Sequence, residues 1–125
     1  MEYAGYQGDK SDMQAVYDFV AGHLQRQGCK ARGEGALHGK AIETCLLRGR
    51  DATKCAIGCL ISDSQYSSDM EIDVAEHWRK TQFPAAIGPL LVELQAVHDL
   101  QKVQDWPRHL RELAILYKLS PMEAQ

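Results

Sequence analysis

The stretch from Cys45 to Ile61 constrains the fold most, because it is the one place where the sequence leaves helical periodicity. It holds three of the four cysteines of the chain. Two short apolar runs flank a polar segment, 49–53, which contains Gly and Asp. This pattern is typical of a β-hairpin. We therefore expect strands near 44–48 and 54–57 joined by a turn.

A helical pattern precedes this stretch. Ser11 and Gln14 have the spacing of a capping box, in which the hydroxyl accepts a backbone N–H and the amide reaches back. Gly28 supplies the left-handed residue that commonly ends a helix. Between them lies one apolar stripe at helical spacing, formed by Met13, Val16, Tyr17, Val20 and Leu24. The sequence predicts a first helix from Ser11 to Gly28.

Two further helices are expected in the second half of the chain. Ser68 and Glu71 form another capping box and predict a helix over 69–81. Pro89, in a first turn, predicts the next helix over 89–104. Apolar residues lie on both of its sides, with Leu90, Leu91, Leu94, Val97 and His98 on one side and Val92, Leu100 and Val103 on the other. A helix that is apolar on both sides is expected to be central.

The last helix is expected to follow Asp105 as its cap, with Pro107 in its first turn and a stripe that begins at Trp106. Together these patterns predict a mainly helical α+β domain, with about four helices packed around a small β-hairpin. Residues 1–10 are polar and aperiodic, so we expect a flexible N-terminal arm before a single domain over 11–121.

The stretch 29–44 breaks the helical pattern, and we expect it to form a long loop. Its Gly-rich part, 33–40, has one feature of a phosphate-cradling loop. It lacks the Lys-Ser/Thr helix start that follows such loops, so an inserted loop is the simpler interpretation.

Composition excludes several classes of protein. The chain has 125 residues with 14 basic and 17 acidic side chains, a net charge of −3, and no basic face that a dedicated nucleic-acid binder would carry. No apolar run is long enough to span a bilayer, and the first ten residues lack the apolar core of a signal peptide. We therefore expect a cytoplasmic protein with reduced thiols, no cofactor, no membrane and no nucleic acid as a partner.

Cys55, His98 and Asp99 are candidate catalytic residues. A nucleophilic thiol needs a base within hydrogen-bond reach and a third group that orients the base. Cys55 lies at the end of an expected strand and His98 lies on an apolar helix face, so the two could meet. Asp99 is the next helical residue, about 100° away around the helix, and is expected to be poorly placed to orient His98. The alternative interpretation is a core histidine, with a carbonyl near Cys55–Gly58 as its partner.

The cysteines also have part of a metal-site pattern. Cys55 and Cys59 have a spacing found in zinc sites, whereas Cys45 lies alone and the sequence has no matching second pair. We interpret these thiols as buried and metal-free, with Cys55 and Cys59 as weak metal candidates.

Basic residues surround the expected turn. Arg48, Arg50 and Lys54 lie at its tip, with Arg32 and Lys40 nearby. They are candidates for an anion-binding or protein-docking surface, and the alternative is that they are ordinary solvated side chains.

One block of the chain is distinctive, from Lys54-Cys-Ala-Ile-Gly-Cys-Leu to Ile61. Together with Cys45-x-x-Arg48-Gly49, Tyr66, Met70-Glu71, Leu94-Gln-x-x-His98-Asp99 and Trp106, it resembles a group of small phage and prophage proteins. The resemblance covers about residues 13–119. Those proteins typically have an aromatic residue where Leu47 stands and a Gly near Ala52. The resemblance implies an origin in a phage or another mobile element, and it carries no activity with it.

Two functions from different classes remain open at this point. The first is a small cytosolic accessory protein that acts by protein–protein binding, to a partner or to itself. The second is a cysteine-dependent hydrolase or transferase that uses Cys55 and His98. The lack of a complete catalytic set favours the first.

Overall fold

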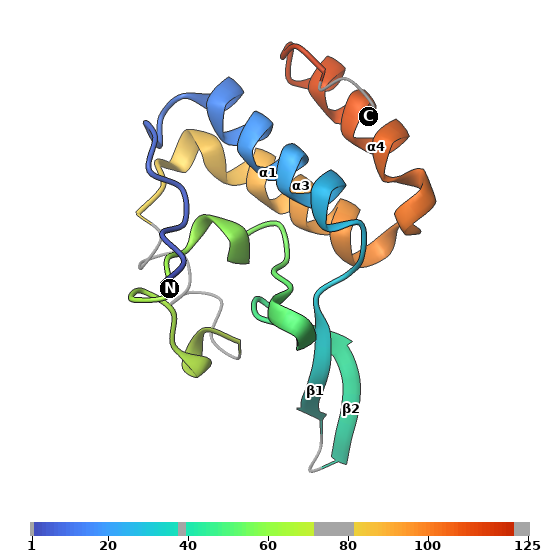
Figure 1. The fold of residues 1–125 in the computed structure, drawn as a ribbon. Coiled ribbons are helices and arrows are strands. Elements are labelled where there is room, and N and C mark those ends of the chain that lie inside the picture. Colours follow the sequence, from blue (N-terminus) through green and yellow to red (C-terminus); the bar gives the residue numbers. More distant parts are fainter. Residues whose placement is uncertain (1, 38–39, 72–81, 122–125) are drawn as a thin grey trace.

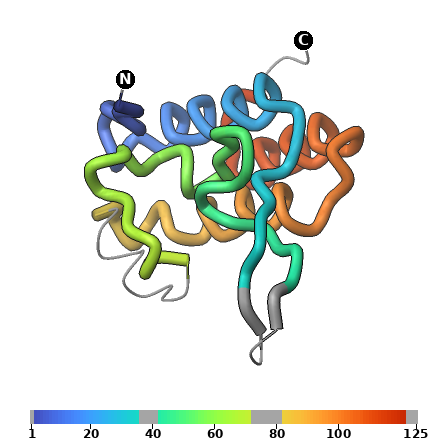
Figure 2. Tube along the Cα trace, turned by 60° about the horizontal axis from the view of Figure 1, so that its bottom comes forward, coloured from blue at the N-terminus to red at the C-terminus, as the bar shows by residue number. Residues whose placement is uncertain are grey.

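The computed structural model describes residues 2–37, 40–71 and 82–121, and it leaves the side chains of 36, 37, 40 and 41 undescribed. Within these ranges lie the α-helices α1 (Met13–Gln27), α3 (Gly88–Leu100) and α4 (Trp106–Leu116) and the strands β1 (Arg32–Leu37) and β2 (Lys40–Cys45). The helices pack against one another, and the two strands project away from them (Figures 1 and 2). The α+β class with a β-hairpin is confirmed, with three α-helices in the described ranges instead of four.

Helix α1 begins one residue later than the capping-box pattern predicts. Asp12 is its N-cap, and its carboxylate accepts the Ala15 N–H at 3.1 Å. Ser11 instead donates its hydroxyl to Asp9. Asp12 lies nearer the free amides of the first turn and offers the stronger acceptor. The end of the helix is confirmed, because Gly28 has a left-handed φ of 65° and donates its N–H to the Leu24 carbonyl.

The hairpin lies earlier in the chain than predicted, in the stretch expected to be a loop. The antiparallel register pairs Gly33 with Thr44 and Gly35 with Ile42. A Cβ on Gly33 would lie 2.7 Å from Leu46 Cδ1, and one on Gly35 would lie 2.7 Å from Thr44 Cγ2. The two glycines therefore leave room for the side chains of Thr44 and Leu46. Strand propensity, which is low for glycine, does not take such close contacts into account.

The predicted strand at 54–57 is wrong. Arg48 and Lys54 form an isolated antiparallel bridge, and Asp51 and Ala52 form a tight turn at φ 58° and 61°. Beyond Lys54 the chain enters a helical turn, in which the Cys59 N–H donates to the Cys55 carbonyl at 3.0 Å. A short buried apolar run has no periodicity that separates a strand from such a turn.

The core lies between the three helices and the apolar run 55–61. The predicted inner face of α3 is buried, as are Val16, Tyr17, Val20 and Leu24 of α1. The other apolar side of α3 is not buried, so the expectation of a helix covered on both sides is wrong in this chain. Helix α3 also ends at Leu100, not 104, because Gln101 takes up an extended backbone.

The start of α4 is at the predicted place, although the expected cap is absent. Asp105 is the N-cap residue, and its side chain makes no capping hydrogen bond. Trp106 and Leu110 are buried as its stripe predicts. Most of the helix predicted over 69–81 lies outside the described residues. Its start is a short 3₁₀ turn, Ser68–Glu71.

Residues 2–10, expected to form a flexible arm, are hydrogen-bonded to the end of the apolar run 55–61 and to Asp63 just after it. The Tyr3 hydroxyl donates to the Cys59 carbonyl at 2.7 Å, and the Tyr6 N–H donates to the Leu60 carbonyl at 3.1 Å. Tyr3 and Asp63 also exchange two further hydrogen bonds. In the structure this segment lies on the domain, beside residues far along the chain (Figure 1).

Candidate functional site

Cys55, the predicted nucleophile, lies inside the core with 1% of its surface exposed. Its Sγ accepts the Gly58 N–H at 3.2 Å. Burial raises the pKa of this thiol to about 12. A reactive cysteine is partly exposed and has a lowered pKa, so Cys55 has the opposite properties.

His98 is fully buried on the inner face of α3. Its Nε2 accepts the Ala31 N–H at 2.9 Å, and its Nδ1 lies 2.6 Å from Asp99 Oδ1. Because Nε2 accepts, the proton of the neutral ring is on Nδ1, which donates to Asp99. The expectation of a carbonyl partner near Cys55–Gly58 is therefore wrong. Both ring nitrogens are occupied, so His98 has no free nitrogen to act as a base for a thiol.

Asp99 does orient His98, contrary to the expectation from helical rotation. Its Oδ1 also accepts the Gln95 Nε2–H at 2.8 Å, one helical turn earlier. The rotation of 100° per residue describes where each Cβ points, whereas the polar ends of neighbouring side chains can still meet. Gln95 in turn uses its Oε1 to accept the Ile57 N–H at 3.0 Å. Asp99 and Gln95 thus connect His98 of α3 to the helical turn Cys55–Cys59, which contains Ile57.

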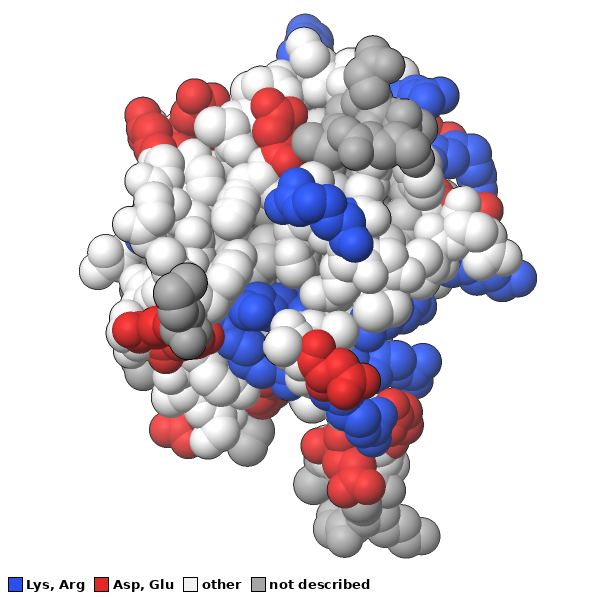
Figure 3. Space-filling view, viewed as in Figure 1, with Lys and Arg blue, Asp and Glu red and all other residues white. Residues whose placement is uncertain are grey.

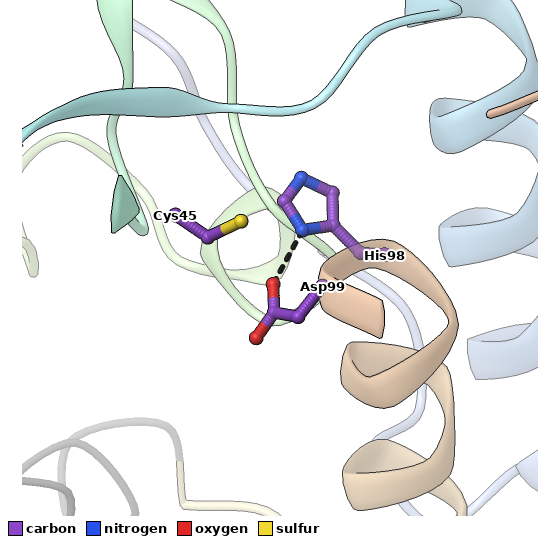
Figure 4. Close-up of side chains that lie close together, drawn as sticks. All are labelled: Cys45, His98 and Asp99. Carbon is purple, nitrogen blue, oxygen red and sulfur yellow. Dashed lines mark hydrogen bonds and ion pairs between the residues drawn. The ribbon is translucent and has the colours of Figure 1, made fainter. Parts of the chain in front are cut away.

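The cysteine near this pair is Cys45, at the end of β2. The donor atoms of Cys45, His98 and Asp99 all lie within 4.8 Å of one another, with the sulfur toward the other two side chains (Figure 4). Burial, followed by the charge of Asp99, raises the pKa of the Cys45 thiol. No local pattern predicts that Cys45 lies near His98, because the two residues are far apart in the chain and belong to different elements.

Cysteine, histidine and aspartate are the donor types of a zinc site, so the group can be tested for fit. A metal on Nδ1 would replace the proton that this nitrogen carries, and Nε2 already receives the Ala31 N–H. A ring that bound a metal through Nδ1 and still accepted the Ala31 N–H at Nε2 would carry no proton, so it would be a negatively charged imidazolate. Cys55 and Cys59, the weak candidates from spacing, are each hydrogen-bonded to nearby backbone. The hydrogen bonds of His98 to Ala31 and Asp99 therefore compete with metal binding at this group.

A shallow cavity of about 190 Å³ adjoins this network. Cys45 and Cys55 both line this cavity, so the fold places the two cysteines at one site. The remaining described lining residues are Leu46, Leu47, Ile57, Met70, Glu71, Gln95 and Asp99. The polar residues among them, Glu71, Gln95 and Asp99, already make hydrogen bonds within the protein, so the wall of the cavity is mainly apolar.

Arg48, predicted as a surface binding residue, points into the protein. Its guanidinium donates to the carbonyls of Gly58 and Ile61 and lies 4.9 Å from the centre of the Tyr66 ring. It also contacts Asp63 at 3.3 Å. Arg48 therefore ties the loop segments together and is not free to bind an anion.

Arg50 and Lys54, the other two basic residues predicted at the tip of the turn, also have partners. Arg50 forms a two-point ion pair with Glu43 of β2, one bond of which is 2.7 Å long. This hydrogen bond lowers the pKa of Glu43. Lys54 donates to the Ala52 carbonyl and lies 4.2 Å from the Tyr3 ring centre. Basic and acidic side chains alternate where the hairpin leaves the body, so the face in Figure 3 has no uniform positive patch there.

Glu71 is a structural residue that sequence reasoning assigned to a different role. Its carboxylate accepts the N–H groups of Leu47 and Arg48 at 2.8 and 3.1 Å and the Tyr66 hydroxyl at 2.7 Å. Burial and the bond to Glu71 raise the pKa of Tyr66. The pattern Ser68-x-x-Glu71 suggested a helix cap, and no local signal distinguishes that from this long-range contact.

No protein-family model matches the chain, and neither a curated protein sequence nor a solved structure is significantly similar to it. Among the described helices, none has both the length and the apolar character needed to cross a membrane.

Proposed function

We propose that this protein acts by binding another protein chain, through the outer faces of α3 and α4, and not by catalysis. The observation that carries the proposal is where apolar surface is exposed. Of the five large apolar side chains exposed in the described residues, four lie on these two helices. They are Val92 and Leu100 of α3, at 55% and 76% exposure, and Ile115 and Leu116 of α4, at 64% and 70%.

A groove of about 240 Å³ runs between the two helices on this side. Its apolar residues are Ala96 and Val97 of α3 and Leu113 and Leu116 of α4. Its polar residues are Glu93, Gln101, His109 and Glu112. Leu116 lines this groove, whereas Val92, Leu100 and Ile115 lie outside it. Single exposed apolar residues are ordinary, but several exposed apolar residues beside one groove are typical of a docking surface for a helix.

The sequence of α3 supports the same conclusion. Val92, Ala96 and Leu100 recur every four residues, which places them along one outer ridge of the helix. This composition is typical of a helix covered on both sides, whereas the single chain covers only one. A binding partner would bury the outer apolar ridge of α3.

A cytoplasmic accessory protein of a phage or another mobile element would fit this role. This part of the proposal depends on the sequence resemblance. Small proteins of such elements commonly act by binding other proteins, and that association supports the proposal without naming a partner.

Chemical crosslinking can test the proposal with purified, tagged protein added to a bacterial lysate. Lys102 and Lys118 follow α3 and α4 and provide amines beside the face. We expect adducts, with a second copy or with another protein, that are lost in Leu100→Asp and kept in Ile42→Asp. Ile42 is an exposed apolar residue on the hairpin, at 39%, and is the matched control. Equal adducts in all three proteins, or none in any, would contradict the proposal.

A further inference from the structure

We infer that the partner on the α3–α4 face is a second copy of this chain, packed about a two-fold axis so that α3 of each copy lies on α4 of the other. This inference depends on the proposed function above. It follows from the charges that accompany the exposed apolar residues, which differ between the two helices.

The outer face of α3 is apolar and is flanked by two carboxylates, Glu93 and Asp99, of which Asp99 is already hydrogen-bonded to His98 and Gln95. Glu93 is exposed, and it forms no ion pair with any residue in the described part of the chain. A helix that packs on this ridge would need apolar residues for Val92 and Leu100 and a positive charge for Glu93.

On α4, Ile115 and Leu116 are exposed, and so are Arg108, Arg111 and Glu112, so this side of the helix carries two basic residues and one acidic residue beside its apolar ones. Arg108 contacts neighbours on its own helix, His109 at 3.4 Å and Glu112 at 3.7 Å. The side chains of Arg108 and Glu112 are both more than half exposed. An exposed pair of this kind stabilises little and can be exchanged for a contact with another carboxylate.

The chain therefore carries both complementary halves of one interface. When the same two patches meet reciprocally, they form a closed two-fold dimer in which each contact occurs twice. Glu93 of one copy would face Arg108 of the other, and the α3 ridge of one copy would approach the groove beside the other copy's Leu116.

The size of the face sets the expected affinity. With 13 and 11 residues, α3 and α4 are about 20 and 16 Å long. A face of this length is at the small end of specific interfaces, so we expect a reversible dimer with a dissociation constant on the order of 10–100 µM.

Analytical ultracentrifugation of the full chain from about 5 to about 500 µM tests the inference. We expect the average mass to rise with concentration toward that of two copies. Leu100→Asp should remain monomeric throughout, and Ile42→Asp should associate like the parent. Circular dichroism establishes that each variant is folded.

A charge exchange makes the test specific to the proposed contact. Glu93→Arg and Arg108→Glu should each weaken self-association by about tenfold or more, because each places like charges together twice. Mixing the two variants should restore association, since both contacts of the mixed dimer then pair opposite charges. Ile42→Glu is the matched control, which adds a charge without affecting association.

A parent chain that stays monomeric at about 500 µM would overturn the second-copy inference. If Leu100→Asp still loses crosslinked adducts with another protein, the proposed function stands without it. A dimer that tolerates Leu100→Asp and both charge changes would also overturn the inference, because it would form through another surface.

Discussion

The helical layer (α1, α3 and α4) and the loop region (Leu46–Glu71) are held together by different interactions. In the helical layer, apolar stripes face one another, and the largest buried side chain is Trp106. Buried hydrogen bonds add to this apolar packing, such as the one that the Tyr17 hydroxyl of α1 donates to the Leu110 carbonyl of α4 at 2.8 Å.

The loop region depends on side chains that bind backbone groups. Arg48 donates to two carbonyls, and Glu71 accepts two backbone N–H groups. The bonds to Glu71 satisfy two backbone N–H groups, of Leu47 and Arg48, that lie outside the strands and helices of the structure. The comparison shows that regular structure lets apolar burial dominate, whereas an irregular segment must obtain its hydrogen bonds from specific side chains.

His98 joins the two regions. It lies on α3, stacks on Trp106 with ring centres 5.6 Å apart, and accepts the Ala31 N–H just before β1. Four substitutions distinguish these two kinds of stabilisation.

Trp106→Ala should lower the free energy of unfolding most, by about 3–5 kcal/mol, because it removes the largest buried side chain from the helical core. Its indole N–H, which donates to the Gln101 carbonyl at 3.3 Å, is lost as well. Urea unfolding followed by circular dichroism measures the change. Ile115→Ala, on the exposed side of α4, is the control. A Trp106→Ala protein as stable as the control would show that core burial does not dominate the helical layer.

His98→Ala should destabilise by about 2–4 kcal/mol, because it leaves a cavity, an unpaired Ala31 N–H and an Asp99 without its partner. His98→Gln should recover part of this loss, since its amide oxygen can still accept a hydrogen bond. Thermal unfolding of both variants against the parent gives the comparison. Equal losses for Ala and Gln would contradict the assigned role of His98, because Gln restores most of the side-chain volume and an acceptor for the Ala31 N–H.

Glu71→Gln should cost about 1.5–3 kcal/mol, because an amide has one acceptor oxygen where the carboxylate uses two. Hydrogen exchange should show faster exchange at the amides of Leu47 and Arg48, with α1 little affected. Asp69→Asn, an exposed neighbour, is the control. Slowed or unchanged exchange at those two amides would contradict the assigned role of Glu71.

Ala52→Gly should stabilise the protein by about 0.5–1 kcal/mol. Ala52 has a φ of 61°, where a Cβ is unfavourable, and Gly removes that strain. Ala86→Gly, in a 3₁₀ turn of ordinary backbone, is the control and should be neutral or destabilising. Differential scanning calorimetry measures both. A lower melting temperature for Ala52→Gly would refute the strain at this turn.

Much of the helical layer was predictable from local pattern. The stripe of α1, its end at Gly28, the inner face of α3 and the burial of Trp106 all follow from spacing along a helix. These features depend on residues within a few turns of one another, where periodicity determines which side faces the core. The candidate site was predicted less well, since His98 and Asp99 were identified but with the wrong cysteine and the wrong partners.

The sequence by itself determined where helices form and which side of each is apolar, because those choices depend on near neighbours. Only the tertiary structure decided that Gly33 and Gly35 belong to a strand, that Cys45 meets His98, and that Glu71 serves Leu47. It also left the second apolar side of α3 exposed. Each of these depends on a partner distant in the chain, and a local pattern specifies that a polar or apolar group needs a partner without specifying which one.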